Sequence, residues 1–93
     1  THRRYLVCYD ISDPRRLRQV AKILQGFGDR LQYSVFECGL DETSLSRLKV
    51  ALEGVVERSE DQVLFVSLGA LAKTHELVFE TVGRPYRKRT SLV

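Results

Sequence analysis

Two short runs of residues are apolar at almost every position, namely 5–9 (YLVCY) and 62–68 (QVLFVSL). Runs of this length, rich in β-branched and aromatic residues and bounded by turn residues, predict strands that are buried on both faces. A chain of 93 residues holds a single domain, so both strands are expected in one small sheet. That sheet must be covered on two sides, which is a strong demand on so short a chain.

Two helices are predicted between these runs, because apolar residues recur there at helical spacing. The first is expected to begin at Pro14, with Ser12 or Asp13 as its cap, and to end at the two glycines of 26–28. The second is expected to open at residue 41 or 43 and to end near residues 58–61.

Residues 31–40 (LQYSVFECGL) first alternate between apolar and polar and then break step, which predicts either one bent strand or two short ones. The resulting order fits an α+β fold, the ferredoxin-like β-α-β-β-α-β sandwich, in which two helices cover one face of an antiparallel sheet. We expect one domain over residues 1–93, with 75–82 as an edge strand and 84–93 as a basic C-terminal tail that ends in an additional short strand.

This plan leaves one face of the sheet without a cover. The runs 5–9 and 62–68 are nevertheless apolar on both sides, so the second face also has to be removed from water. The sheet of another copy is the simplest cover. We therefore predict a homodimer packed through its two sheets.

Asp10 directly follows the first apolar strand, where a carboxylate is held rigidly and close to solvent. Mg2+ prefers oxygen ligands and takes one or two carboxylates from a protein, so the Asp10 residues of two subunits can share one ion across a two-fold axis. Such an ion, or Mn2+, would activate water for attack on a phosphodiester and stabilise the charge that develops. Alternatively, Asp10 and Asp13 only shape the turn and cap the helix, a role that is sufficient to explain Asp13.

The net charge of +3 does not by itself indicate nucleic acid, but the basic residues are unevenly distributed. Four of them are predicted to lie on the outer face of the first helix: Arg15, Arg16, Arg18 and Lys22. Together with those at 3–4 and 84–89, they can neutralise phosphates of RNA or DNA. The alternative is an ordinary solvated helix face.

Cys8 and Cys38 lie in apolar, strand-like segments and are predicted to be reduced core residues rather than a disulfide or part of a zinc site. The sequence has neither an apolar run of the roughly 20 residues that a membrane-spanning helix needs nor the pattern of a signal peptide. We therefore expect a cytoplasmic protein without a membrane partner.

Several of these segments together resemble one known family. The run YLVCYDISDPRR, the helix RLRQVAKIL, the stretch GDRLQYSVFECGL and the apolar run 62–68 carry the likeness. The specific part is Tyr-Asp-Ile-Ser-Asp at the end of an apolar strand, followed at this distance by Gln-Tyr-Ser-Val-Phe-Glu. In these features the chain is similar to the CRISPR-associated protein 2 family, while residues 70–90 match the family pattern only loosely.

That resemblance implies a ferredoxin-like homodimer in which Asp10 binds Mg2+. It implies a metal-dependent endonuclease that cleaves single-stranded RNA or double-stranded DNA and takes part in CRISPR spacer acquisition. It also implies an alternative, a non-catalytic dimeric scaffold that bridges dimers of the CRISPR integrase and holds the incoming DNA. A third possibility is a toxin-like ribonuclease that acts on messenger RNA without an integrase.

Overall fold

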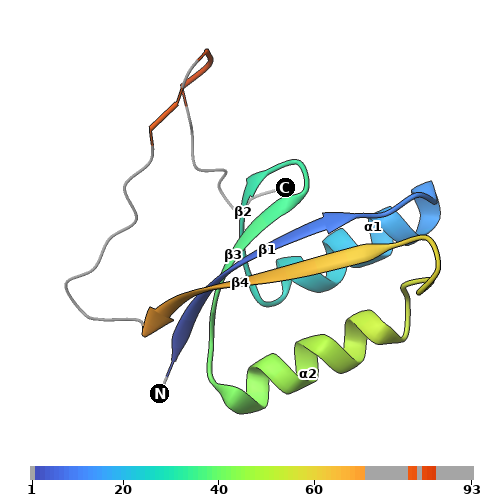
Figure 1. The fold of residues 1–93 in the computed structure, drawn as a ribbon, viewed down its shortest axis with the longest axis horizontal. Coiled ribbons are helices and arrows are strands. Elements are labelled where there is room, and N and C mark those ends of the chain that lie inside the picture. Colours follow the sequence, from blue (N-terminus) through green and yellow to red (C-terminus); the bar gives the residue numbers. More distant parts are fainter. Residues whose placement is uncertain (1, 71–79, 82, 86–93) are drawn as a thin grey trace.

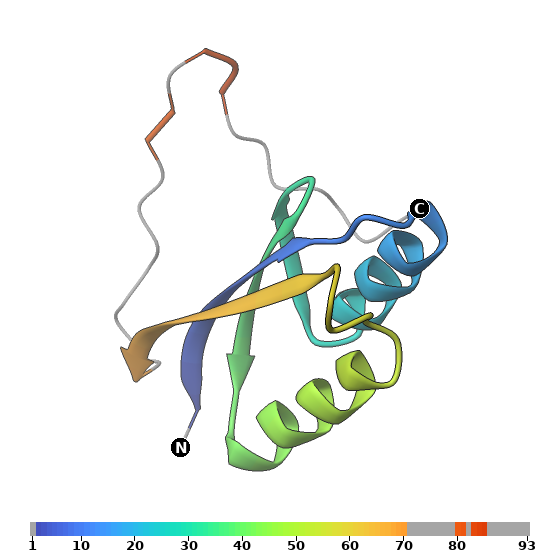
Figure 2. The same ribbon diagram turned by 45° about the vertical axis from the view of Figure 1, so that its right-hand side comes forward.

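The structure is a computed structural model, and it describes residues 2–70, 80–81 and 83–85. The strands form one antiparallel sheet in the order β2-β3-β1-β4, and both helices lie on the same side of it (Figures 1 and 2). This arrangement confirms the predicted ferredoxin-like plan. Its elements are β1 (Arg3–Asp10), α1 (Pro14–Gln25), β2 (Gly28–Gln32), β3 (Val35–Leu40), α2 (Glu42–Glu53) and β4 (Gln62–Ala70).

Both helices begin at an aspartate cap. Oδ2 of Asp13 accepts hydrogen bonds from the backbone N–H groups of Arg15 and Arg16, each at 3.0 Å. Oδ1 of Asp41 accepts one from the backbone N–H of Ser44 at 2.8 Å. These bonds satisfy N–H groups that have no partner within the helix, which is why the helix starts could be predicted from the residue types.

The helix ends agree with the prediction only in part. Helix α1 ends at Gln25 with Gly26 as its C-cap, as predicted. Gly28, however, does not belong to the helix end but opens β2, where any side chain would collide with the backbone carbonyl of Glu37 on β3. Helix α2 stops at Glu53, well before residues 58–61. The intervening residues form a separate turn instead, in which the N–H groups of Glu60 and Asp61 donate to the carbonyl of Glu57 at 3.0 and 2.8 Å.

Residues 31–40 form two strands rather than one bent strand. Strands β2 and β3 are joined by a turn at Tyr33 and Ser34, and Gln32 pairs with Val35 across it. The register of this strand pair shifts between Arg30 and Gln32. The alternation in the sequence breaks step just after the turn, where a second strand with its own alternation begins.

The core lies between the sheet and the two helices. Alternate residues of the strands point into it, and the helices contribute the apolar positions that were predicted from their spacing. Burial raises the pKa of the Cys38 thiol to about 11, so this cysteine is an unreactive core residue. The largest fully buried side chains are Phe36, Leu24, Leu48, Val7, Val20 and Cys38.

The opposite side of the sheet carries an apolar surface that no part of the described chain covers. We call it the open face, and it consists of Leu6, Cys8, Leu64, Val66 and Leu68. The register places Leu6 beside Val66 and Cys8 beside Leu64. The side chains of Leu64, Val66 and Leu68 are 50%, 38% and 43% exposed. Cys8 was predicted to be a core residue. The structure instead places it half-buried on the open face.

Two of the sequence predictions concern segments that lie mostly outside the described residues. These are the edge strand over 75–82 and the final strand of the tail over 84–93. Within the residues that the structure describes, no helix is long and apolar enough to cross a membrane.

We predict that Val7→Ala lowers the free energy of unfolding by about 2–3 kcal/mol, because it removes two methyl groups from a fully buried position and leaves a cavity. The matched control is Val50→Ala on the exposed side of α2, where the side chain is 69% exposed and the change should stay within about 0.5 kcal/mol. Urea unfolding at one protein concentration measures both. Equal losses in the two variants would contradict the assignment of the core.

Candidate functional site

Asp10 is the last residue of β1 and lies on the same side of the sheet as the open face. Strand alternation places it there with Leu6 and Cys8, and it pairs with Gln62 at the start of β4. Asp10 itself is exposed, whereas the next residue, Ile11, is buried in the core. The Asp10 carboxylate therefore projects from a backbone that is fixed on both sides, by the sheet before it and by the core after it.

A buried carboxylate holds the loop that follows Asp10. The side chain of Asp61 has no exposed surface. Its Oδ1 accepts a hydrogen bond from the backbone N–H of Ser12 at 3.1 Å, and its Oδ2 accepts from Nε of Arg16 at 2.7 Å and from the backbone N–H of Glu57 at 2.9 Å. Glu60 accepts from Arg16 and from the Ser12 hydroxyl, each at 3.1 Å. We call Ser12, Arg16, Glu60 and Asp61 the Asp61 cluster.

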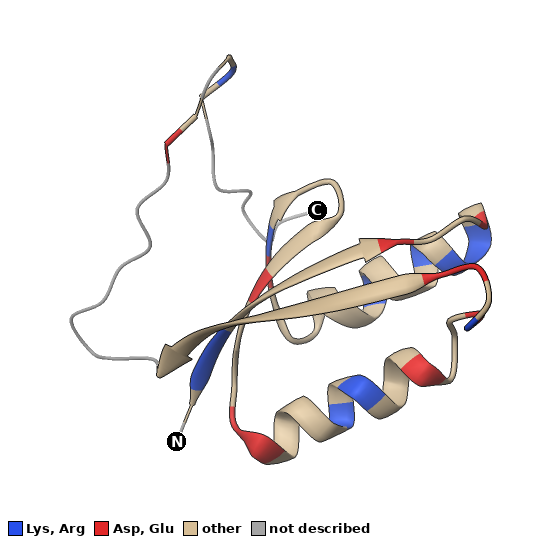
Figure 3. Ribbon diagram, viewed as in Figure 1, with Lys and Arg blue, Asp and Glu red and all other residues tan. Residues whose placement is uncertain are grey.

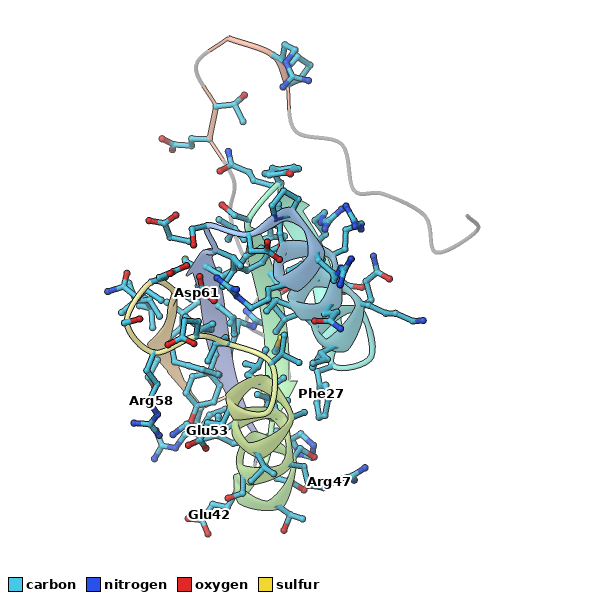
Figure 4. The ribbon with its side chains drawn as sticks, turned by 90° about the vertical axis from the view of Figure 1, so that its right-hand side faces the viewer. Phe27, Glu42, Arg47, Glu53, Arg58 and Asp61 are labelled. Atoms are coloured by element: carbon cyan, nitrogen blue, oxygen red, sulfur yellow. The ribbon has the colours of Figure 1, made fainter. Side chains whose placement is uncertain are left out.

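Contacts within the Asp61 cluster shift the pKa values of Asp61 and Arg16. The hydrogen bond from Arg16, with further ones from Glu57 and Ser12, holds the pKa of Asp61 well below its usual range. The same contact with Asp61 raises the pKa of the Arg16 guanidinium. Both groups are therefore charged throughout the physiological pH range. In Figure 4, Asp61 lies where the loop before β4 passes the beginning of α1.

The position of Arg16 corrects one expectation. Arg16 was predicted to point outward with its three basic neighbours, but only 24% of its side chain is exposed and its charge is paired inside the cluster. Arg15, Arg18 and Lys22 are exposed, as predicted. Figure 3 shows these basic residues along α1. Of the four basic residues, Arg16 thus links the start of α1 to the loop before β4, and the other three face solvent.

The turn between β2 and β3 lies at the same end of the sheet as Asp10. The backbone N–H of Tyr9 donates to the carbonyl of Ser34 at 3.0 Å, and the Tyr9 hydroxyl donates to the carbonyl of Tyr33 at 2.9 Å. Arg30 adds a contact of 3.4 Å from Nη2 to the Tyr9 hydroxyl, and its guanidinium lies 5.2 Å from the centre of the Phe36 ring. Tyr9, directly before Asp10, therefore ties this turn to β1.

One chain offers few side chains that could bind a metal ion near Asp10. Asp13 accepts both hydrogen bonds of the α1 cap through its Oδ2. In the part of the chain that the structure describes, no three His, Cys, Asp or Glu residues are grouped so that they could hold a metal ion. One exposed carboxylate suits a hard cation such as Mg2+ when water and phosphate complete the coordination. The residues fit such an ion best if a second subunit supplies a second Asp10.

Sequence reasoning missed Asp61 and Arg30. The acidic residues at 60 and 61 were visible in the sequence, but no local pattern relates them to Arg16 or Ser12. Arg30 lies in an irregular strand whose side could not be assigned. Contacts between residues this far apart in sequence have no signature in periodicity or spacing.

Comparison with known proteins gives a consistent picture. The sequence matches the family CRISPR associated protein Cas2 over residues 3–74, which include Asp10 and every described helix and strand. It is 40% identical over 82 residues to CRISPR-associated endoribonuclease Cas2 1 of Rhodospirillum rubrum, covering 88% of this chain and 79% of that protein. It is 39% identical over 74 residues to CRISPR-associated endonuclease Cas2 of Halalkalibacterium halodurans, covering 74% and 77%. The crystal structure of Streptococcus pyogenes Cas2 aligns with a TM-score of 0.71 and 33% identity, covering 86% and 99%.

We predict that Asp61→Asn lowers the melting temperature by roughly 5–15 °C near neutral pH, because the buried Arg16 contact loses its charged acceptor. The pKa of Asp61 is lower in the folded than in the unfolded chain. Its stabilising contribution is therefore complete above its ordinary pKa of about 4 and is lost as the pH falls below that value. The difference between the two proteins should shrink in that acidic range.

The matched control is Glu60→Gln, because Glu60 also accepts from Arg16 but its side chain is 58% exposed. Its melting temperature should stay close to that of the unmodified protein. Differential scanning calorimetry at several pH values measures all three proteins. If Asp61→Asn melted at the unmodified temperature at neutral pH, the structural role of this carboxylate would be refuted.

Proposed function

This chain belongs to the CRISPR associated protein Cas2 family, and on that premise we propose that it is a homodimeric, Mg2+-dependent endonuclease in which Asp10 is the metal-binding and catalytic residue. The observation that carries the proposal is the position of Asp10. It is exposed, on a fixed backbone, on the same side of the sheet as the open face.

The open face supports the dimer. Its apolar side chains stand in two neighbouring strands and are uncovered within the described chain. Covering them with the same surface of a second copy would remove them from water without any further element. Because Asp10 continues the row of Leu6 and Cys8 on β1, an interface with two-fold symmetry across this face can bring two Asp10 carboxylates together.

The chemistry follows from what two carboxylates can hold. A bound Mg2+, for which Mn2+ is the substitute, lowers the pKa of water and stabilises negative charge on a phosphoryl oxygen. The chain itself contributes the Asp10 carboxylate and a backbone that keeps it in place between β1, Ile11 and the Asp61 cluster. The substrate we assign is a phosphodiester of single-stranded RNA or double-stranded DNA, in keeping with relatives that are endoribonucleases or endonucleases by name.

The exposed face of α1 is proposed to hold the nucleic acid. Arg15, Arg18 and Lys22 are exposed and can neutralise backbone phosphates without any preference for a base. Arg16 was included in the binding surface from the sequence. Because its charge is paired with Asp61 and Glu60, we propose that it mainly holds the fold.

A second function, a non-catalytic scaffold, is favoured by the sparse site. Each chain offers one carboxylate, Asp10, and the described residues include no cluster that could hold a metal ion. These are few ligands for a metal ion that would catalyse hydrolysis. In this alternative the dimer holds DNA through α1 and bridges dimers of the CRISPR integrase during spacer acquisition in the cytoplasm. Asp10 then contributes to neither binding nor integration.

We predict that Asp10→Asn reduces Mg2+-dependent cleavage by at least about 100-fold, because the charged metal ligand is lost. Labelled single-stranded RNA and duplex DNA, each with Mg2+ and with EDTA, provide the measurement. The matched control is Asp13→Asn, prepared identically, because asparagine is as good a helix cap as aspartate and cleavage should be unchanged. Two results would instead support the scaffold. One is cleavage by Asp10→Asn at the rate of the unmodified protein, and the other is no cleavage by either the unmodified protein or Asp10→Asn.

We predict that Arg18→Ala weakens binding to nucleic acid of any sequence and reduces the slope of log Kd against log salt concentration by about 1, because one phosphate contact is lost. The control is Arg47→Ala, which removes an exposed arginine from α2 instead. Fluorescence anisotropy over a series of salt concentrations measures both. A larger effect of Arg47→Ala would move the binding surface from α1 to α2.

A further inference from the structure

Tyr33 is the most exposed large apolar side chain among the described residues, at 72%. It lies at the turn between β2 and β3, next to the strand end that carries Asp10. We propose that the Tyr33 ring is a stacking site for an unpaired nucleobase of the strand whose backbone reaches Asp10. A single exposed aromatic residue is common on protein surfaces and needs no explanation by itself, so two further observations carry the argument.

The first observation is the residue type at this turn. Two-residue turns between antiparallel strands favour glycine or asparagine, because their usual forms need a positive φ. Tyr33 and Ser34 form this turn, and among the described residues every one with a positive φ is a glycine, at 69 or 83. This turn therefore needs no positive φ, and its backbone geometry neither excludes tyrosine nor calls for it. Packing does not call for it either, because Tyr33 is 72% exposed. The ring is thus required by neither the turn nor the core, and its face is open to a ligand.

The second observation is the rigid attachment of the turn to the Asp10 strand. The antiparallel register pairs Cys8 with Val35, so that Tyr33 and Ser34 follow alongside Tyr9 and Asp10. The hydrogen bonds from Tyr9 to the carbonyls of Tyr33 and Ser34, at 2.9 and 3.0 Å, fix the turn there. The Tyr33 backbone therefore keeps a constant distance from the Asp10 backbone, as a base-binding site beside a reacting phosphodiester requires.

The ligand that suits such a site is a nucleobase in a single strand. Every base has a π face, so stacking on tyrosine requires no particular sequence, whereas bases inside a duplex are already stacked and paired. The inference rests on the proposed function and narrows it, since it selects single-stranded over double-stranded nucleic acid as the preferred substrate at Asp10.

The test compares Tyr33→Leu with Tyr33→Phe, both combined with Asp10→Asn so that bound strands stay uncut. The probe is a single-stranded RNA that carries 2-aminopurine, whose fluorescence is quenched on stacking. The Phe variant should bind and quench like the Tyr33 protein, because the ring is kept. The Leu variant should raise the Kd for the single strand about 10-fold and lose the quenching, while the Kd for a fully paired duplex is unchanged.

Three results would overturn the stacking site. They are equal Kd and quenching in the Leu and Phe variants, equal weakening of single strand and duplex by Leu, and conversion of a dimer to a monomer by Leu in analytical ultracentrifugation. The last would show that Tyr33 contacts a second copy of the chain. Cleavage by Asp10→Asn at the unmodified rate would refute the proposed nuclease alone, because stacking is read from binding and fluorescence.

Discussion

The carboxylate of Asp61 lies without exposed surface between two loops, and its hydrogen bonds join elements that are distant in the sequence. Arg16 comes from the first turn of α1 and Ser12 from the loop after β1. A buried charge is stable only when it is paired and its oxygens accept hydrogen bonds, and both conditions are met here. The loop after Asp10, the start of α1 and the start of β4 are thereby held as one unit.

The sheet imposes a second constraint, because two helices can cover only one of its faces. Val7 and Phe36 are removed from water on the helical side. Leu64 and Val66 stay exposed on the other. The same strand alternation that builds the core thus creates the open face, and it places Asp10 on that face. The proposed interface between subunits and the proposed metal site are therefore two consequences of one pattern.

Much of the fold was predictable because its signals are local. The apolar run at 5–9 gave β1, and the aspartates at 13 and 41 capped the helices as their residue type indicates. The prediction was wrong where a distant contact decided the outcome. Gly28 opens β2 because β3 passes too close for a side chain, and α2 ends early because residues 57–61 form a turn of their own around Asp61.

The candidate site divides in the same way. The sequence by itself determined that Asp10 ends a buried strand and that a basic helix face follows, because strand and helix periods are set by neighbouring residues. Only the tertiary structure decided that Arg16 is paired with Asp61, 45 residues away, and that Tyr33 lies beside the strand end of Asp10. Such pairings depend on how the elements pack and on strand register, and neither is written in the spacing of residues along one segment.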